Sequence, residues 1–340
     1  MLLAGDIGGT KTNLGIFSIE KGPLEPLVEA TFPSGQYPGL EALVEEFLKQ
    51  TALKVKHACF GVAGTVIDDK AKITNLPWVV EKESLRKTLN LGHVSLLNDL
   101  EAIAYGVPLL GPNDLHTINK GIPVTGGTMA IIAPGTGLGE AFLIWDGARY
   151  RAYPSEGGHS DFAPNNPLEI NLLKYLHKKW EHASYESVCS GQGLVNIYEF
   201  LKDTGYAKEP VWLSEQLNVA NDPNPVIVKA ALNNKKACSL CTATLDVFVS
   251  VLGAEAGNFA LKVLATGGVY LGGGIPPKII HALKDRQFME SFTRKGRFSE
   301  LVSRIPVHII LNPNIALIGA ASYGLELLEA HSCKPIVDNY

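Results

Sequence analysis

The sequence has little surplus charge and no long hydrophobic run. Its 340 residues carry a formal net charge of −4 and contain no long run of lysine and arginine, whereas binding to a nucleic-acid backbone needs clustered positive charge. No window approaches the roughly 18 consecutive apolar residues that span a bilayer, and the first residues, MLLAGDIGG, do not have the form of a signal peptide. We therefore expect a cytoplasmic protein that binds neither nucleic acid nor membranes.

Cysteine is scarce and scattered. The chain has five cysteines, an odd number in a chain of this length, which argues against a disulfide framework and favours reduced thiols. Cys238 and Cys241 form a lone CxxC within an expected helix, without the second pair that would complete a tetrahedral zinc site. We interpret both as buried or half-buried helical thiols.

Apolar runs and glycine-rich turns alternate in two similar blocks. In the first block, LLAGD and NLGIF flank the turn GGTKT, and the helical pattern GLEALVEEFLKQ is followed by the strand-like VKHACFGVAG. In the second block, TMAIIAP and EAFLIWDG flank GTGLG. The repetition predicts an α/β fold that arose by duplication.

Length and turn signals indicate two domains. The chain is longer than the roughly 100–200 residues of a typical domain, and the Gly, Pro and Asn of GPNDL mark a boundary near residue 111. Helical patterns follow around 167–182, 193–203 and 225–264, and NIALIGAASYGLELLEA predicts a C-terminal helix that packs back on the first lobe. We expect a small α/β lobe of residues 1–110 with 314–340 and a large α/β lobe of residues 111–313.

Three glycine clusters follow apolar strands, in DIGGTKT, APGTGLGEA and LGGGI. Without Cβ atoms, backbone N–H groups can approach phosphate oxygens closely, so three such turns favour a nucleoside polyphosphate as ligand. None is a Walker A loop, because G-K-[ST] does not occur, and GTGLG does not open a helix as a dinucleotide fingerprint must. The residues expected to bind the nucleotide are Asp6, Ile7, Gly8, Gly9, Thr10, Lys11, Gly135, Thr136, Gly137, Gly273 and Gly274.

Asp6 is the acidic residue of the first glycine turn. Its carboxylate would repel the phosphates unless a divalent cation lay between them. We therefore expect Mg²⁺ to bind together with ATP, with Asp6 contacting the ion through water and no separate metal site on the protein.

Seven segments occur in the order found in bacterial glucokinases. They are DIGGTKT, TNLPW, LLNDLEA, APGTGLGEA, EGGHSDFAP, YESVCSG and LGGGI. The chain resembles this family, within the sugar kinase, heat-shock protein 70 and actin superfamily, from Gly5 to about Gly319. The resemblance implies two ribonuclease-H-like (actin-like ATPase) lobes with a cleft in which a hexose and ATP meet. It also implies ATP-dependent phosphorylation of D-glucose to glucose 6-phosphate, and a homodimer.

Asp99 follows the strand-like HVSLLN. A sugar kinase needs a carboxylate that accepts the proton of the attacking hydroxyl, but an aspartate before LEAIAYG could equally be a helix N-cap. The resemblance implies that Asp99 is the catalytic base.

The resemblance also implies a set of sugar-binding residues with acidic, amide and imidazole side chains, which satisfy hydroxyl donors and acceptors. Taken alone, the two glutamates of this set would be interpreted as solvated loop residues and the histidine as a surface residue. The set is Asn75, Asn98, Asp99, Glu156, His159 and Glu186.

Other functions remain open at this point. In the related repressor, open-reading-frame and sugar kinase family, a histidine near the position of His159 binds zinc with a CxCGxxxGC cluster, which this sequence lacks. A sugar-responsive regulator would need a helix-turn-helix, for which Asp6 leaves no room ahead of it. An actin-like ATPase would not explain EGGH or NLPW. A kinase for another hexose or an N-acetylhexosamine stays possible, as does ADP or polyphosphate as phosphoryl donor.

Overall fold

A computed structural model describes residues 1–233 and 238–332, and residue contacts divide them into two compact units. Unit 1 contains Met1–Asn113, Ala148–Pro154 and the segment that begins at Asn312, whereas unit 2 contains Asp114–Gly147 and Ser155–Leu311. Both units are α/β, as the sequence predicts. The division into domains at 110 and 313 remains a prediction; the sequence pattern did not separate residues 148–154, which cluster with unit 1.

Unit 1 is built on a five-stranded sheet with the order β3-β2-β1-β4-β8. The predicted first hairpin is confirmed, since β1 pairs antiparallel with β2, while β4 and β8 continue the sheet in parallel. The side chains of β1 alternate between two cores, because successive residues of a strand point to opposite faces. Leu3 and Ile7 pack in the core that includes the helix α1, and Leu2 and Ala4 pack in the core that includes α12.

A small second sheet, β5-β6-β7, follows β4 in unit 1. The strands and helices of unit 1 are β1 (Leu2–Ile7), β2 (Lys11–Phe17), β3 (Val28–Pro33), α1 (Leu40–Thr51), β4 (His57–Val62), β5 (Val66–Ile67), β6 (Lys70–Lys72), β7 (Val79–Glu81), α2 (Lys82–Thr88), β8 (His93–Asn98), α3 (Asp99–Gly106) and α12 (Ile315–Ser332).

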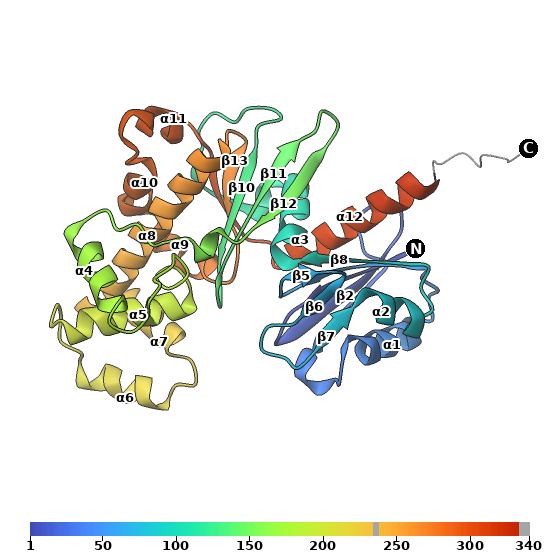
Figure 1. Ribbon diagram of the computed structural model, residues 1–340, viewed down its shortest axis with the longest axis horizontal. Helices are drawn as coiled ribbons and strands as arrows, with labels where there is room; N and C mark the ends of the chain where they lie inside the picture. The colour runs from blue at the N-terminus through green and yellow to red at the C-terminus, as the bar shows by residue number, and fades with distance from the viewer. Residues whose placement is uncertain (234–237, 333–340) are drawn as a thin grey trace, which may run out of the picture. The chain divides into compact units, whose positions relative to one another are not determined.

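Helices α3 and α12 lie in close contact in unit 1 (Figure 1). A side chain at Gly319 of α12 would overlap the carbonyl group of Ala102, and one at Gly106 would come within 2.5 Å of the Ile315 side chain. Glycine at both positions therefore allows the two backbones to approach. The predicted return of the C-terminal helix to the first part of the chain is confirmed.

Unit 2 repeats the strand pattern of unit 1. Its strands run in the order β11-β10-β13-β14-β9. β10 pairs antiparallel with β11 and parallel with β13, as β1 does with β2 and β4. The shared pattern supports the duplication inferred from the sequence. The elements are β9 (Leu115–Asn119), β10 (Met129–Pro134), β11 (Leu138–Trp145), α4 (Pro167–Leu176), α5 (Gly191–Asp203), α6 (Val211–Val219), α7 (Pro223–Ala231), α8 (Ser239–Val263), β13 (Gly268–Leu271), α9 (Ile280–Lys284), α10 (Arg286–Thr293), α11 (Ser299–Ser303) and β14 (Val307–Ile310). The strand β12 (Tyr150–Ser155) lies between two segments of unit 2 in sequence, but its residues 150–154 are assigned to unit 1.

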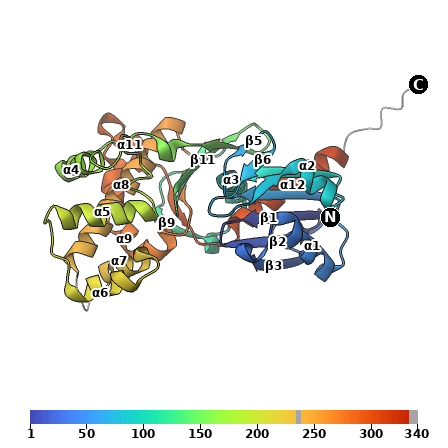
Figure 2. The ribbon, with the colours of Figure 1, turned by 60° about the horizontal axis from the view of Figure 1, so that its bottom comes forward.

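Helix α8 runs through the core of unit 2, between α5, α7 and α10 (Figures 1 and 2). It is long and apolar enough to cross a membrane, but 83% of its most apolar 18-residue window is buried inside the unit. We therefore interpret it as a core helix. The continuous helical stretch expected over 225–264 is wrong: the structure has two helices, α7 and α8. Cys238 and Cys241, at the start of α8, are buried as predicted.

Candidate active site

The first glycine turn lies against the TNLPW segment (residues 74–78) in unit 1. The Gly8 N–H donates to the Lys11 carbonyl group at 3.0 Å and closes the turn. A side chain at Gly9 would come within 2.5 Å of the Thr74 carbonyl oxygen and 3.4 Å of the Asn75 Cβ. The close approach therefore requires glycine at position 9 and brings Asn75 to the turn, although these segments are far apart in sequence.

Asn98 and Asp99 lie where β8 meets α3. Because β1, β4 and β8 are parallel, this is the same edge of the sheet at which β1 delivers the first glycine turn. The Asn98 side chain is the N-cap of α3, accepting from the Leu100 N–H at 2.9 Å and donating to the Gly64 carbonyl group at 3.1 Å. Asp99 is the first helical residue and shares the same Leu100 N–H. The N-cap of α3 is therefore Asn98 and not Asp99.

Burial and a second acidic group raise the pKa of Asp99 to about 6. Burial is the larger cause, the negative charge of Asp6 adds to it, and the hydrogen bond from the Leu100 N–H acts in the opposite direction. Burial also raises the pKa of Asp6, despite a hydrogen bond at 3.1 Å from Asn13. The edge of the unit 1 sheet therefore carries two carboxyl groups whose pKa values are both raised.

Glu186 joins three segments of unit 2. One carboxylate oxygen accepts the Leu138 N–H at 2.9 Å, directly after the GTG turn (residues 135–137), and a side chain at Gly137 would come within 2.5 Å of the same oxygen. The Glu186 N–H donates to the Gly158 carbonyl group at 2.8 Å, within the EGGH loop (residues 156–159). The other carboxylate oxygen lies 3.7 Å from His159 Nε2. The structure therefore brings the predicted residues Gly137, His159 and Glu186 together.

The second and third glycine clusters are neighbours in unit 2. Gly273 has φ 78°, and a side chain there would come within 2.5 Å of the Pro134 carbonyl oxygen at the end of β10. At Gly135 and Gly274, in contrast, no atom lies within 4 Å of where a side chain would begin. The space that a side chain would occupy is therefore open at these two positions.

The remaining predicted residues differ in exposure. The Ile7 side chain is fully buried in the core, so only its backbone could reach a ligand, whereas Thr10 and Lys11 are exposed. Glu156 and His159 are also exposed. The predicted residues thus form one cluster in each unit.

The acidic side chains of the site suit a cation whose other ligands are water molecules and substrate phosphates. Among residues 1–233 and 238–332, no group of three or more His, Cys, Asp or Glu side chains could hold a metal ion. Mg²⁺ usually keeps several waters and takes one or two carboxylates together with substrate phosphates. Asp6 fits that mode, in which Mg²⁺ binds with the nucleotide.

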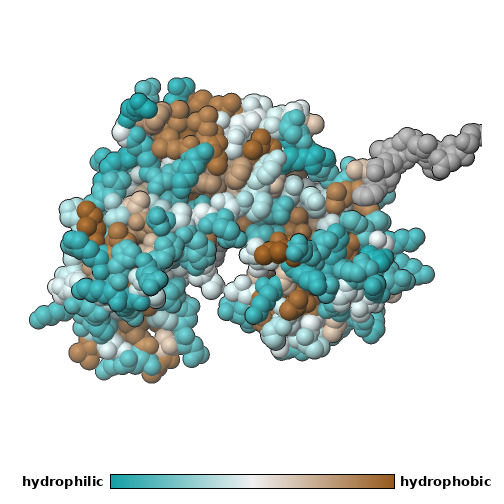
Figure 3. All heavy atoms as spheres, in the orientation of Figure 1, coloured by the Kyte–Doolittle hydropathy of each residue, from teal (hydrophilic) through white to brown (hydrophobic). Residues whose placement is uncertain are grey.

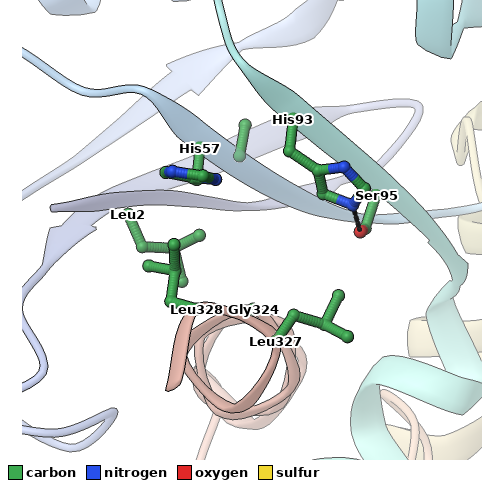
Figure 4. A pocket seen from close by; sticks show the side chains of 8 residues that line it. Leu2, His57, His93, Ser95, Gly324, Leu327 and Leu328 are labelled. Carbon is green, nitrogen blue, oxygen red and sulfur yellow. Dashed lines mark hydrogen bonds between the residues drawn. The ribbon is translucent and has the colours of Figure 1, made fainter. Parts of the chain in front are cut away.

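A small pocket in unit 1 lies away from these residues (Figure 4). Its lining includes Leu2, His57 and His93, which are the first residues of β1, β4 and β8. It therefore lies at the amino ends of the parallel strands, opposite the edge that carries Asp6 and Asp99, and it is not part of the candidate site.

Two buried glutamates near the unit 2 cluster were not predicted from the sequence. Glu140 is 2% exposed and Glu255 is fully buried. Each interrupts an apolar run, in GEAFLIW and VLGAEAGNFAL, and an acidic residue inside such a run is the signal that could have identified them.

The known proteins to which this chain is similar include glucokinases. The glucokinase family profile matches residues 3–327. A glucokinase of Trichormus variabilis is 43% identical over 336 residues, covering 94% of this chain and 98% of the relative. The crystal structure of a glucokinase from an Antarctic psychrotroph is 30% identical with a TM-score of 0.80, covering 96% of this chain and 98% of its own.

A more distant structure has the same fold. A ROK family glucokinase from Streptomyces griseus, solved with glucose and AMPPNP, is 19% identical with a TM-score of 0.62 and covers 96% of this chain and 99% of its own. The expected two-lobe, actin-like ATPase fold is confirmed. The family match and the identity over nearly the whole length establish that this chain belongs to the glucokinase family.

Proposed function

We propose that this chain transfers the γ-phosphoryl group of Mg-ATP to the C6 hydroxyl of D-glucose, with Asp99 as the general base. As a member of the glucokinase family, the chain is an ATP-dependent hexose kinase. The observation that carries the role of Asp99 is its position at the edge of the unit 1 sheet with a pKa raised to about 6. A carboxylate with a pKa near neutrality is ionised at pH 7 and is still basic enough to accept a proton.

Asp99 would act by taking the proton of the attacking hydroxyl as the phosphoryl group is transferred. The Leu100 N–H holds the Asp99 carboxylate at 2.9 Å, which fixes one oxygen and leaves the other for the sugar hydroxyl. Because phosphoryl transfer needs little covalent chemistry from the protein, positioning and electrostatics should supply most of the rate enhancement.

We assign glucose binding to residues of both units. Asn98 and Asp99 project from the start of α3, and Asn75 lies beside the first glycine turn. In unit 2, Glu156, His159 and Glu186 belong to segments that hydrogen bond to one another. Carboxylate, amide and imidazole groups match the donors and acceptors of a ring of hydroxyls.

We assign the nucleotide to the glycine turns of both units. The open space beside Gly135 and Gly274 supports phosphate binding there, and the acidic Asp6 supports a hydrated Mg²⁺ that binds together with the nucleotide. When bound, Mg²⁺ neutralises phosphate charge. Thr10, Lys11 and Thr136 add donors beside these turns.

We further propose a cytoplasmic homodimer, formed through an apolar patch of unit 2. Ile122, Val124, Leu264 and Phe298 are 59%, 52%, 53% and 43% exposed, and the first two line a groove of about 400 Å³ beside α11. Figure 3 shows apolar residues gathered on the surface near this helix. Exposed apolar patches of this kind are typical of interaction surfaces.

Substitution of the base should separate catalysis from binding. Asp99→Asn should lower kcat by roughly 10²–10⁴-fold, because the amide cannot accept the proton. The glucose KM should change less than about tenfold, since the other polar side chains remain. Steady-state kinetics with glucose check this, with Asp68→Asn in an exposed turn of unit 1 as control. Turnover within about tenfold of wild type would remove Asp99 from the mechanism.

The pH profile should report the same group. The base must be ionised, so kcat/KM for glucose should fall as the pH drops through about 6, the raised pKa of Asp99. The measurement is kcat/KM between pH 4.5 and 8 at low Mg-ATP, so that the free enzyme is observed. An acid limb near the ordinary aspartate value of 3.8 would contradict the assignment.

The dimer can be tested on the patch itself. Ile122→Asp places a charge in the groove and should convert a dimer into a monomer in sedimentation velocity. Val219→Asp, at an exposed site on α6, is the matched control and should leave the dimer intact. A monomeric wild type, or a dimeric Ile122→Asp, would contradict the proposed interface.

A further inference from the structure

Glu140 points from β11 into the space between the sheet and α8. It is 2% exposed and lies two residues before Phe142, on the same face of the strand. The Phe142 ring packs against Phe259 of α8 with a centroid distance of 6.4 Å. A carboxyl group therefore occupies a position in the apolar layer where an aliphatic side chain would be expected.

The Glu140 carboxyl group lies directly beneath the EGGH loop. A side chain at Gly157 would overlap Glu140 Oε2, and a side chain at Gly158 would overlap the Leu138 carbonyl group. The Gly157 N–H donates to Ser155 Oγ at 3.0 Å. Both glycines of the loop are thus required because β11 fills the space beneath them, and Glu140 fills it under Gly157.

The nearest charges make an ionised Glu140 costly. Glu255 of α8 is fully buried and is already paired with Lys262 Nζ at 3.2 Å and Asn258 Nδ2 at 3.0 Å. Within the described chain, Glu140 Oε1 is buried without a hydrogen-bond partner. Burial first, and then the charge of Glu255, raise the pKa of Glu140 to about 8, against a smaller opposite effect of Lys262. Glu140 is therefore mostly neutral at pH 7, which lets two buried carboxyl groups coexist.

Hydrogen bonds link Glu255 to Tyr185, the residue before Glu186. Asn258 Nδ2, which binds Glu255, also donates to the Tyr185 hydroxyl at 2.9 Å. Asn258 Oδ1 accepts from Lys295 Nζ at 2.7 Å. The titratable groups around Glu140 are completed by the buried thiol of Cys189 and, above the loop, by His159 and Glu186.

We propose that Glu140, in its neutral form, is a positioning residue that holds the EGGH loop, and through it Glu156 and His159, in the arrangement that binds glucose. Ionisation leaves a buried charge with no hydrogen-bond partner at Oε1 within the described chain, and hydration of the carboxylate would disturb its close contact with Gly157. The loop and its two side chains then leave their places, so that glucose binds more weakly. This inference rests on the sugar-binding role proposed for Glu156 and His159.

The kinetic test compares glucose KM and kcat between pH 6 and 9. If only the neutral form is competent, the wild-type KM should rise about tenfold from pH 6 to 9, in proportion to the loss of that form, with kcat much less affected. Glu140→Gln keeps the shape without the proton, so its KM should not rise. Glu290→Gln, an exposed site on α10, should follow wild type. A flat wild-type KM, or the same rise in Glu140→Gln, would overturn the proposal.

Thermal unfolding gives a readout that is independent of the sugar. The folded pKa of Glu140, about 8, lies above the ordinary value of 4.5, so its contribution to stability is present at low pH and is lost as the pH rises from about 4.5 to about 8. The Tm of Glu140→Gln relative to wild type should therefore increase over this range. A pH-independent difference would overturn the neutral state of Glu140. If Glu156→Ala left the glucose KM unchanged, the sugar site would be wrong, and the positioning role with it.

Discussion

The carboxylate of Glu186 is the contact on which the unit 2 cluster depends. The carboxylate accepts the backbone N–H that follows the GTG turn, and the backbone N–H of Glu186 donates to the EGGH loop. The side chain of Glu186 binds the phosphate-type turn and its backbone binds the polar loop, so this one residue fixes the relative positions of the two segments. These segments are distant in sequence and none has a hydrophobic core of its own. Their geometry therefore depends on the scaffold that places Glu186.

Buried carboxyl groups occur in both units, with different consequences. At the edge of the unit 1 sheet, burial raises the pKa values of Asp6 and Asp99, and the negative charge of Asp6 raises that of Asp99 further, which suits a base beside a cation-bound phosphate. In unit 2, the same physical causes raise the pKa of Glu140 further, to about 8, because the group is enclosed between a strand and a helix. Burial thus raises the pKa of Asp99, which suits a general base. In our proposal, burial also keeps Glu140 neutral, so that it can hold the EGGH loop in place.

Much of this arrangement could be predicted from local patterns. The two hairpins, the strand that ends at Asn98 and the returning C-terminal helix follow from alternating or helical apolar spacing, which packing against a core enforces. The stretch from 225 to 264 was predicted as one helical stretch because most of it is apolar, although the polar run NNKK at 233–236 interrupts it and is the signal that could have divided it. Glu140 and Glu255 were missed because their roles depend on pairing between a strand and a helix far apart in sequence.

Some site residues could be predicted from local sequence patterns, and others only from the family resemblance. The glycine turns were identifiable from chemistry and position, but the resemblance to glucokinases was needed to choose the base over the helix cap for Asp99 and to select Glu156, His159 and Glu186 from other loop residues. Asn98, rather than Asp99, proved to be the helix cap. The distinction depends on a single residue at the start of α3, and helix boundaries are not determined that finely by sequence.

The claim that the chain is a glucose-specific kinase is tested most directly by a coupled assay for ADP production. Purified protein would be assayed with Mg-ATP and, separately, glucose, mannose, fructose and N-acetylglucosamine. The account predicts sugar-dependent ADP formation with a clear preference for glucose. Equal or greater turnover with another sugar, or ADP release that does not depend on any sugar, would contradict it.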